Sequence, residues 1–313
     1  MATIDLIVPT YRDVSKVFQK NLIQTINQVQ CRCGNHLPWQ CDRGKHSLYM
    51  QPHVDSCVIH WSRNTLVSTF LHAPTIEGRP PADYCLMLDD DILLEQGSLE
   101  RMLSHRKDCV VGICTKRADP PEPTIRQWNA ETGRFDAIVE WDWRSQKLME
   151  VDGAGAACML IKRGVLEKMA EAYLDCFFER HASANLLVKI GASIALLEDA
   201  DKYWDAQSAK RRQRYAEALA NENWQAATCW WFQFMWDQEG NERGEMAEDL
   251  SFCWKIKRLG YRIFADPQVL PGHLGLYAYN VRDFIWVRES EKASMLPRPN
   301  ESDGTNPQLT PIN

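Results

Sequence analysis

The hydrophobic positions in the first third of the chain alternate between two patterns. Ile4 to Val8 form an apolar run that is interrupted only by Asp5 and closed by Pro9, which is typical of a strand buried on both faces. Apolar residues then recur at helical spacing from Val14 to Val29, and again after Ser62, a residue that can cap a helix. A second short apolar run, Cys85 to Leu88, ends abruptly in three aspartates.

The same alternation continues as far as residue 114 and predicts the fold class. Ser98 can cap a further helix that runs to about His105, and Val110 to Cys114 has the pattern of another strand. Strands that alternate with helices imply an open, mostly parallel sheet with helices on both faces, which is a Rossmann-like α/β fold.

The second half of the chain is more mixed. Residues 136–151 resemble two strands around a polar turn, and small residues lead into a strand at Cys158 to Ile161. The segment Glu248 to Leu259 predicts a helix ended by Gly260, and Tyr261 to Ala265 predicts the strand that follows it.

These patterns predict one domain over residues 1–293 with two insertions. The first insertion covers about residues 31–53. The second covers about residues 166–245 and is expected to be mostly helical up to about residue 235. Residues 294–313 are rich in Pro, Asn, Ser and Thr and are expected to form a flexible tail.

Composition and charge narrow the class of protein. The 313 residues include 36 basic and 42 acidic side chains, and the net charge of -6 argues against a generally basic nucleic-acid-binding surface. No stretch approaches the ~20 apolar residues of a membrane span, and the first apolar run is expected to be a strand rather than a signal peptide. The eleven cysteines are then expected to be reduced, as core residues or metal ligands. We expect a cytoplasmic protein, located in the host cytoplasm if the chain is viral.

The acidic triplet after Leu88 is the first candidate for chemistry. Asp89 and Asp91 share a face if the strand continues through them, with Asp90 between them. Adjacent carboxylates repel one another and favour a cation, and Mg²⁺ or Mn²⁺ often takes one or two carboxylates plus substrate phosphates. Ligands of open α/β sheets bind beyond the carboxyl ends of strands, where this triplet lies. The alternative is a strand that ends in a solvated acidic turn.

Five segments resemble, in order, the motifs of GT-A glycosyltransferases. They are Val8–Arg12, Ser62–Asn64, Leu88–Ile92, Glu248–Cys253 and Pro271–Gly275. Each match is weak alone, but their order and spacing form a strong combined signal. The similarity is greatest to the family-two-like group, which contains many inverting enzymes. It implies a GT-A fold and transfer of a sugar from a nucleotide diphosphate, most simply a UDP-sugar.

The resemblance also implies roles for individual residues. The nucleotide-sugar contacts are expected at Pro9, Thr10, Tyr11, Arg12, Arg63, Asp89 and Asp90. The Mn²⁺ or Mg²⁺ ligands of the DxD motif are expected to be Asp89 and Asp91, with His273 completing the metal shell. Two simpler interpretations remain open: His273 only occupies a turn between glycines, and Arg63 is an ordinary surface arginine.

Sugar transfer with inversion needs a base that takes the proton of the acceptor hydroxyl. We expect Asp249 to be that base and Glu248 to position it. The alternative for both acids is helix capping, because negative charge at a helix N-terminus stabilises the helix dipole.

The run from Gly153 to Ala157 is compatible with close approach of a sugar to the backbone, although a packing turn explains it nearly as well. Asp152, just before the run, is a candidate to bind a hydroxyl of the donor sugar. The spacing of the run does not match a dinucleotide-binding glycine loop.

The first insertion is rich in cysteine and histidine. Zinc favours four such ligands and would stabilise a short segment that has little core of its own. The candidate structural Zn²⁺ ligands are Cys31, Cys33, Cys41 and His46. The C-x-C start is not a common zinc spacing, so free thiols are the alternative.

The second insertion joins a basic stretch at residues 210–214 to an aromatic stretch at residues 224–236. Basic and aromatic side chains together hold a phosphate backbone and stack on exposed bases. The alternative is a helix with a solvated basic face followed by an aromatic core or a homo-oligomer contact.

The overall pattern also resembles virus-associated glycosyltransferases, phage enzymes among them, that act beside TET-type oxygenases. These enzymes modify hydroxymethylated pyrimidines in DNA. The resemblance implies 5-hydroxymethylcytosine in DNA as the leading acceptor. A saccharide, lipid-linked or small-molecule acceptor is the alternative, and the acidic composition favours it.

Two other classes of function are less compatible with the motifs. A sugar nucleotidyltransferase would show a Gly-rich basic loop after the first strand, where this chain has Pro9 to Asp13. A non-catalytic nucleic-acid-binding protein would leave the acidic triplet and the Glu248–Asp249 pair without a role.

Overall fold

The computed structural model describes most of the chain, and the fold and site below are built on that part. The described residues are 2–9, 15–29, 46–50, 58–73, 81–117, 121–189, 194–224, 226–236 and 245–274, together with residues 281, 285, 288 and 289.

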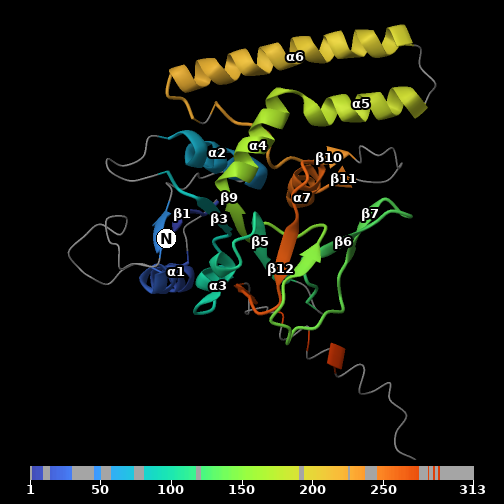
Figure 1. Cartoon of the computed structure of the whole chain (residues 1–313). Helices are drawn as coiled ribbons and strands as arrows, with labels where there is room; N and C mark the ends of the chain where they lie inside the picture. The colour runs from blue at the N-terminus through green and yellow to red at the C-terminus, as the bar shows by residue number, and fades with distance from the viewer. Residues whose placement is uncertain are drawn as a thin grey trace, which may run out of the picture.

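A seven-stranded sheet forms the centre of the molecule, in the order β2-β1-β3-β9-β5-β12-β8 (Figure 1). Its strands are β1 (Ala2–Ile7), β2 (His46–Met50), β3 (Tyr84–Leu88), β5 (Cys109–Gly112), β8 (Met149–Val151), β9 (Cys158–Lys162) and β12 (Ile263–Asp266). Only β8 and β9 run antiparallel to their neighbours in this sheet. The prediction of a mixed α/β fold with a mostly parallel central sheet is confirmed, and the arrangement is consistent with a GT-A-like fold.

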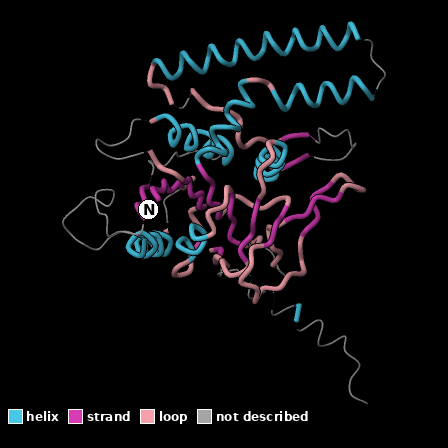
Figure 2. The backbone as a smooth tube through the Cα atoms, viewed as in Figure 1, coloured by secondary structure: helices cyan, strands magenta, loops and turns pink. Residues whose placement is uncertain are grey.

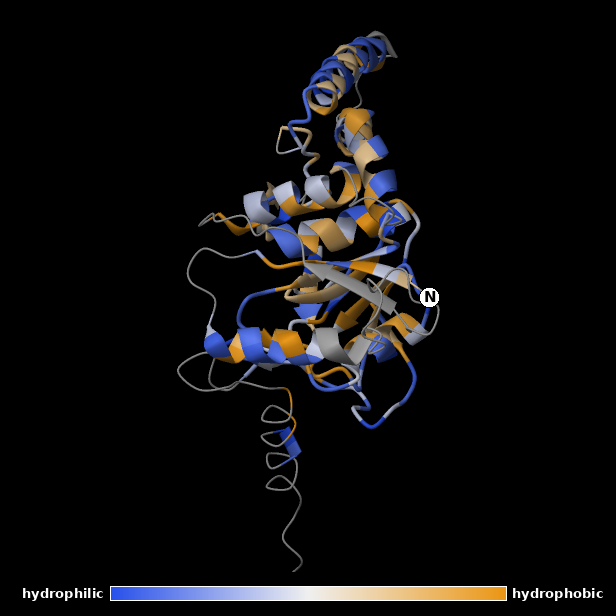
Figure 3. Cartoon of the chain, turned by 90° about the vertical axis from the view of Figure 1, so that its left-hand side faces the viewer, coloured by the Kyte–Doolittle hydropathy of each residue, from blue (hydrophilic) through white to orange (hydrophobic). Residues whose placement is uncertain are grey.

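Helices cover both faces of the sheet (Figure 3). One face carries α2 (Ile59–His72), α4 (Arg163–Leu174) and α7 (Glu248–Arg258), and the other carries α1 (Lys16–Val29) and α3 (Ser98–Ser104). The pleat of β3 explains the division, because alternate side chains of a strand point to opposite faces. Cys85 and Met87 pack in the core beneath α2, α4 and α7, whereas Leu86 and Leu88 pack against α1 and α3.

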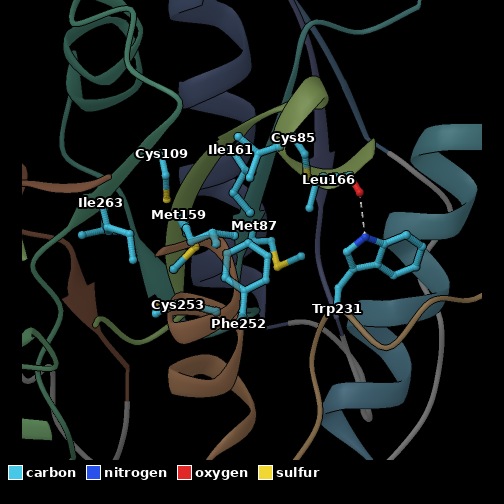
Figure 4. Close-up of a cluster of buried hydrophobic side chains, with 14 of the residues drawn as sticks. Cys85, Met87, Cys109, Met159, Ile161, Leu166, Trp231, Phe252, Cys253 and Ile263 are labelled. Atoms are coloured by element: carbon cyan, nitrogen blue, oxygen red, sulfur yellow. Dashed lines mark hydrogen bonds between the residues drawn. The ribbon is translucent and has the colours of Figure 1, made fainter. Parts of the chain in front are cut away.

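The core beneath α2, α4 and α7 contains a buried tryptophan outside the sheet (Figure 4). Trp231 is 1% exposed, and its Nε1 donates a hydrogen bond to the carbonyl of Leu166 over 3.0 Å. Its neighbour Phe232 is also buried and stacks on Phe252 of α7, with ring centroids 4.5 Å apart. The segment that precedes α7 is therefore fixed to the body by its own side chains.

The predicted helical insertion forms an arm that extends beyond the sheet (Figures 1 and 2). The arm consists of α5 (Phe177–Lys189) and α6 (Ile194–Ala220), which lie side by side. The helical pattern ends earlier than predicted. After α6 the chain turns back to the body, and β10 (Met235–Trp236) pairs with β11 (Glu245–Met246).

Two strand and helix predictions differ from the structure in their details. The strands predicted within residues 136–151 do not pair with each other. Instead β7 (Arg134–Ala137) pairs with β6 (Arg126–Asn129), and β8 joins the edge of the main sheet. Ser62 does not cap α2 but lies within its first turn, since its N–H already bonds to the carbonyl of Val58.

The end of α7 lies where the sequence predicts it. Gly260 follows α7 with a φ of 84°, the left-handed conformation that favours glycine at this position.

Within the described ranges, no helix has the length and apolarity that crossing a membrane requires.

The insertion predicted at residues 31–53 includes part of the sheet. Residues 46–50 form β2, which pairs in parallel with β1 at the sheet edge. Residues 30–45 and 51–57 lie outside the described part of the chain.

Replacing Trp231 with phenylalanine is expected to destabilise the protein by about 2–3 kcal/mol. The change removes the hydrogen bond from Nε1 to the carbonyl of Leu166 and leaves a small cavity. Urea unfolding of the full chain would measure the loss.

The matched control is the same substitution at Trp61, which is 58% exposed. A surface change of this kind alters the free energy of unfolding by about 0.5 kcal/mol or less. Equal destabilisation by the two substitutions would contradict the buried anchor at Trp231.

Candidate active site

The acidic triplet follows β3 in a turn rather than in a continued strand. The N–H of Asp89 bonds to the carbonyl of Ala157 on the antiparallel neighbour, and the N–H of Ile92 bonds back to the carbonyl of Asp89. The chain then enters β4 (Ile92–Leu93). The strand stops at Leu88, so the condition under which Asp89 and Asp91 would share one strand face is not met, and the two carboxylates have different partners.

Arg63 connects the acidic triplet to the start of α7. The side chain is almost fully buried, so it is not a surface arginine. Its Nη2 donates to both carboxylate oxygens of Asp89, over 2.9 and 3.1 Å, and its Nη1 donates to Glu248 over 2.9 Å. Burial alone would lower the pKa of Arg63, but the charges of Asp89 and Glu248 raise it above the ordinary value. The guanidinium therefore stays charged between the two carboxylates.

Asp91 belongs to a second cluster on the other side of the turn. Its Oδ2 lies 3.3 Å from Nε2 of His273 and 3.0 Å from Nη1 of Arg117. The strand β13 (Gly272–His273) pairs with β4 and brings His273 to this position. Burial alone would raise the pKa of Asp91, but the hydrogen bond and charge of His273, with the charge of Arg117, lower it.

His273 is a potential second ligand for a divalent cation at Asp91. The Nδ1 of His273 lies 2.7 Å from the carbonyl of Thr115, and an N–H on Nδ1 would donate to that oxygen. Nε2 faces Asp91 and is engaged with its carboxylate, so a divalent cation between the two side chains would have to replace this hydrogen bond.

Asp89 does not join this pair, since its carboxylate is held by Arg63. In the part of the chain that is described, no three histidine, cysteine, aspartate or glutamate side chains are grouped so that they could hold a metal. Asp91 and His273 thus supply two candidate ligands, and a bound ion would need further ligands from substrate phosphates or water.

Asp249 lies at the N-terminal end of α7, next to Glu248. Burial raises its pKa to about 6, and the charge of Glu248 adds to this effect while that of Arg63 opposes it. The helix-capping alternative keeps direct support at Asp249, whose Oδ1 accepts a hydrogen bond from the N–H of Leu250 over 2.7 Å in the first turn of α7. For Glu248 the support is weaker. The N-cap residue is Ala247 without a side-chain cap, and the Glu248 carboxylate binds Arg63 instead of the helix N–H groups.

Asp152 is already engaged by protein groups. Its carboxylate accepts hydrogen bonds from the side chain of Gln127 and, over 2.7 Å, from the backbone N–H of Trp128, and it pairs with Lys257. These contacts fix the β6–β7 hairpin to α7. A donor-sugar hydroxyl would have to share this carboxylate with them.

The glycine run after Asp152 has a packing function. A Cβ on Gly153 would lie 2.8 Å from the side chain of Leu250 and 3.1 Å from that of Phe135. A larger residue there would separate α7 from the β6–β7 hairpin, so the packing interpretation of the run has direct structural support.

Several predicted site residues cannot be assigned a geometry. Thr10, Tyr11 and Arg12 of the first loop and the candidate zinc ligands Cys31, Cys33 and Cys41 lie outside the described residues. His46 begins β2, where only the backbone is described. Pro9 follows β1 and is buried, and Asp90 is 9% exposed within the turn.

Arg117 is a site residue that the sequence analysis missed. It follows β5 at the same edge of the sheet as the acidic triplet, and its side chain is 45% exposed beside Asp91. A basic residue soon after a strand whose carboxyl end meets this edge was the available signal.

Basic residues of the second insertion form ion pairs with neighbouring acidic residues. Arg211 bonds to the carbonyl of Tyr173 and pairs with Glu179, and Arg212 pairs with Asp175. These contacts hold α6 to α4 and α5. Two of the basic residues that favoured a nucleic-acid surface are therefore neutralised by acids of the same arm.

Replacing Arg63 with lysine is expected to destabilise the protein by about 3 kcal/mol, because one ammonium cannot serve two buried carboxylates as a forked guanidinium does. The measurement is urea unfolding at neutral pH. Arg212→Lys is the matched control at an exposed ion pair, where the change should be less than about 1 kcal/mol. Similar values for both variants would refute the bridging role of Arg63.

Comparisons with known proteins give only distant likenesses. No protein-family model matches the sequence, and no curated protein matches it. The crystal structure of A197 from STIV is similar with a TM-score of 0.40 and 12% sequence identity, over 88% of this chain and 86% of that one. The crystal structure of GalNAc-T7 with UDP, GalNAc and Mn²⁺ is similar with a TM-score of 0.38 and 9% identity, over 92% of this chain and 47% of that one. At these values neither likeness carries a conclusion about activity, so the function has to be argued from the site.

Proposed function

We propose that the protein is a metal-dependent glycosyltransferase that moves a sugar from a UDP-sugar to an acceptor hydroxyl with inversion. One observation carries the proposal: buried Arg63 joins Asp89, at the end of β3, to Glu248, beside the pKa-shifted Asp249. A partly buried carboxylate with a raised pKa among charged groups is a candidate for acid–base catalysis.

Asp249 is the proposed general base. A pKa of about 6 leaves it ionised at neutral pH yet basic enough to take the proton of an acceptor hydroxyl as that oxygen attacks the sugar. Arg63 holds Glu248 and so fixes the start of α7, which carries Asp249. Glu248 thus acts as a positioning residue.

The donor is proposed to lie at the turn after β3. Asp91 and His273 would hold Mn²⁺ or Mg²⁺, which as a Lewis acid supplies charge neutralisation on the departing diphosphate. Arg117 lies beside Asp91 and adds a second positive charge there. The loop from Pro9 to Arg12, together with Asp90, is proposed to contact the nucleotide, and Asp152 to meet a donor-sugar hydroxyl.

The acceptor is the least constrained part of the proposal. The sequence resemblance implies 5-hydroxymethylcytosine in DNA, and the alternative is a saccharide, lipid-linked or small-molecule hydroxyl. The ion pairs of Arg211 and Arg212 remove part of the support for DNA. A cytoplasmic location, a structural Zn²⁺ and a homo-oligomer remain predictions.

Nucleotide-sugar hydrolysis tests the transferase proposal. Purified protein with Mn²⁺ is expected to release UDP from at least one of UDP-glucose, UDP-galactose and UDP-N-acetylglucosamine. The assay is run with and without DNA that contains hydroxymethylcytosine. Release that rises with this DNA would support the DNA acceptor, and release that ignores it would favour the other acceptors.

Variants of the proposed metal ligands test whether UDP release depends on the metal site. Asp91→Asn and His273→Gln are each expected to lower metal-dependent UDP release by about tenfold or more. Asp199→Asn, on the exposed surface of α6, is the control that should leave release unchanged. No release from any donor, together with unchanged Mn²⁺ binding in Asp91→Asn, would refute the proposal.

The pH dependence of Asp249 gives a separate prediction for activity. UDP release is expected to rise with pH through about 6 as the carboxyl loses its proton, and then to level off. Asp249→Asn is expected to lower the rate by about 100-fold or more and to remove this pH step.

The same shift predicts an opposite effect on stability. A carboxyl whose pKa is raised on folding contributes stability below its ordinary pKa and loses it as the pH rises through 6. Asp249→Asn is therefore expected to be more stable than the wild type at pH 8, by about 2 kcal/mol. A less stable variant at pH 8 would instead favour a helix-capping role.

A further inference from the structure

Three exposed aromatic side chains gather around His60 at the start of α2. Trp61 is 58% exposed, Trp230 41% and Phe234 51%. The ring centroids of these residues lie 6.5, 6.4 and 5.4 Å from that of His60. Large aromatic side chains that cluster on a surface mark a binding site more often than single exposed ones do. We call Trp61, Trp230, Phe234 and His60 the aromatic platform.

The aromatic platform borders the candidate active site. The guanidinium of Arg63, which binds Glu248, lies 5.7 Å from the ring centroid of Phe232, in the same segment as Trp230 and Phe234. The charge of Glu248 also opposes the lowering of the pKa of His60 by burial. Asn64 belongs to the same helix as His60 and directly follows Arg63, the residue that binds Glu248. A molecule on the aromatic platform would therefore lie near the start of α7, which carries the proposed base.

The backbone beneath the aromatic platform is firmly held. The side chain of Asn64 makes two hydrogen bonds with the backbone of Phe232, over 2.7 and 2.9 Å. From α7, the hydroxyl of Ser251 donates to the carbonyl of Gln233, and Nζ of Lys255 donates to the carbonyl of Trp230 over 2.5 Å. The segment that carries Trp230 and Phe234 is thus fixed to α2, which carries Trp61, and to α7, which carries Asp249. This is the pre-organisation that a binding site requires.

A pocket of about 240 Å³ opens between the two exposed indoles. It is lined by Trp61, Asn64, Thr65, Thr228 and Trp230. The Asn64 amide is already engaged with the backbone, which leaves the two threonine hydroxyls as the polar groups available to a ligand. Among the described residues that line the pocket, none carries a charge.

The lining favours a neutral ligand that has both an apolar face and hydroxyl groups. A pyranose ring presents axial C–H groups that pack on the negative face of an indole, and its hydroxyls can bond to threonine. A nucleic acid would need basic side chains for its phosphates. Arg211 and Arg212 do not meet this need, since both are ion-paired within the arm.

We propose that the pocket between Trp61 and Trp230 is a saccharide-binding acceptor subsite. The identification as an acceptor subsite rests on the proposed glycosyltransferase activity, whereas saccharide binding itself does not. The acceptor sugar stacks on the indoles, and a neighbouring hydroxyl of the saccharide is the one that Asp249 deprotonates.

Saccharide binding is measured with the full-length protein and four probes: maltose, cellobiose, lactose and N,N′-diacetylchitobiose. Saturation-transfer NMR and tryptophan fluorescence report binding. At least one probe is expected to bind the wild type. Trp230→Ala and Trp61→Ala should each weaken that binding by about tenfold or more, as truncation of an aromatic anchor does. Trp230→Phe, which keeps a stacking ring, should retain most of the affinity.

Binding of UDP with Mn²⁺ is measured on the same variants as an independent readout. It is expected to be unchanged, because neither indole belongs to the proposed donor site. Saccharide binding that depends on Trp230 in a protein that neither binds UDP nor cleaves any UDP-sugar would uphold the saccharide site and refute the transferase.

Three results would overturn the saccharide site. They are no binding of any of the four probes, probe binding that is equal in wild type and Trp230→Ala, and binding of a hydroxymethylcytosine oligonucleotide that is lost in Trp230→Ala. The last result would assign the aromatic platform to a nucleic acid. Unfolding measurements on each variant separate these results from a folding defect.

Discussion

The buried guanidinium of Arg63 is the interaction on which the organisation of the site depends. It joins residues 26 and 185 positions away in the sequence, one at the end of β3 and one at the start of α7. Removing charges from water costs several kcal/mol per ion, and this cost is offset only when the geometry is good. The planar fork of arginine meets that condition, because separate N–H groups serve Asp89 and Glu248. Arg63 thereby fixes both the turn after β3 and the first turn of α7.

The sequence predicted the sheet well because burial leaves a direct pattern. Apolar runs in β1, β3 and β5 marked strands covered on both faces, and Gly260 marked the end of α7. The sequence could not predict which side chains meet. The partners of Arg63, and the place of Arg117 beside Asp91, depend on the turns that follow each strand, and local spacing does not encode contacts between distant segments.

The aromatic stretch before α7 is a second feature whose contacts the sequence could not predict. Six aromatic residues within a short segment have no clear periodicity, so the sequence left open whether they form a core or a surface. The structure contains both, with Trp231 and Phe232 buried and Trp230 and Phe234 exposed. The division is made by hydrogen bonds from α2 and α7 to the backbone of this segment. Burial at this junction also lowers the pKa of Lys255 to about 7.

The order of strands in the sheet has a consequence for the synthesis of the protein. β12 occupies residues 263–266, yet it pairs with β5 at residues 109–112 and is the strand that binds β8 at the sheet edge. A ribosome must therefore make most of the chain before the sheet can close, and pairings so distant in sequence form slowly. Until then β5 presents an open edge that invites pairing with other chains. Since α7 immediately precedes β12, Glu248 and Asp249 reach their positions in this same late step. A nascent chain stopped before residue 248 therefore lacks both the complete sheet and the complete site.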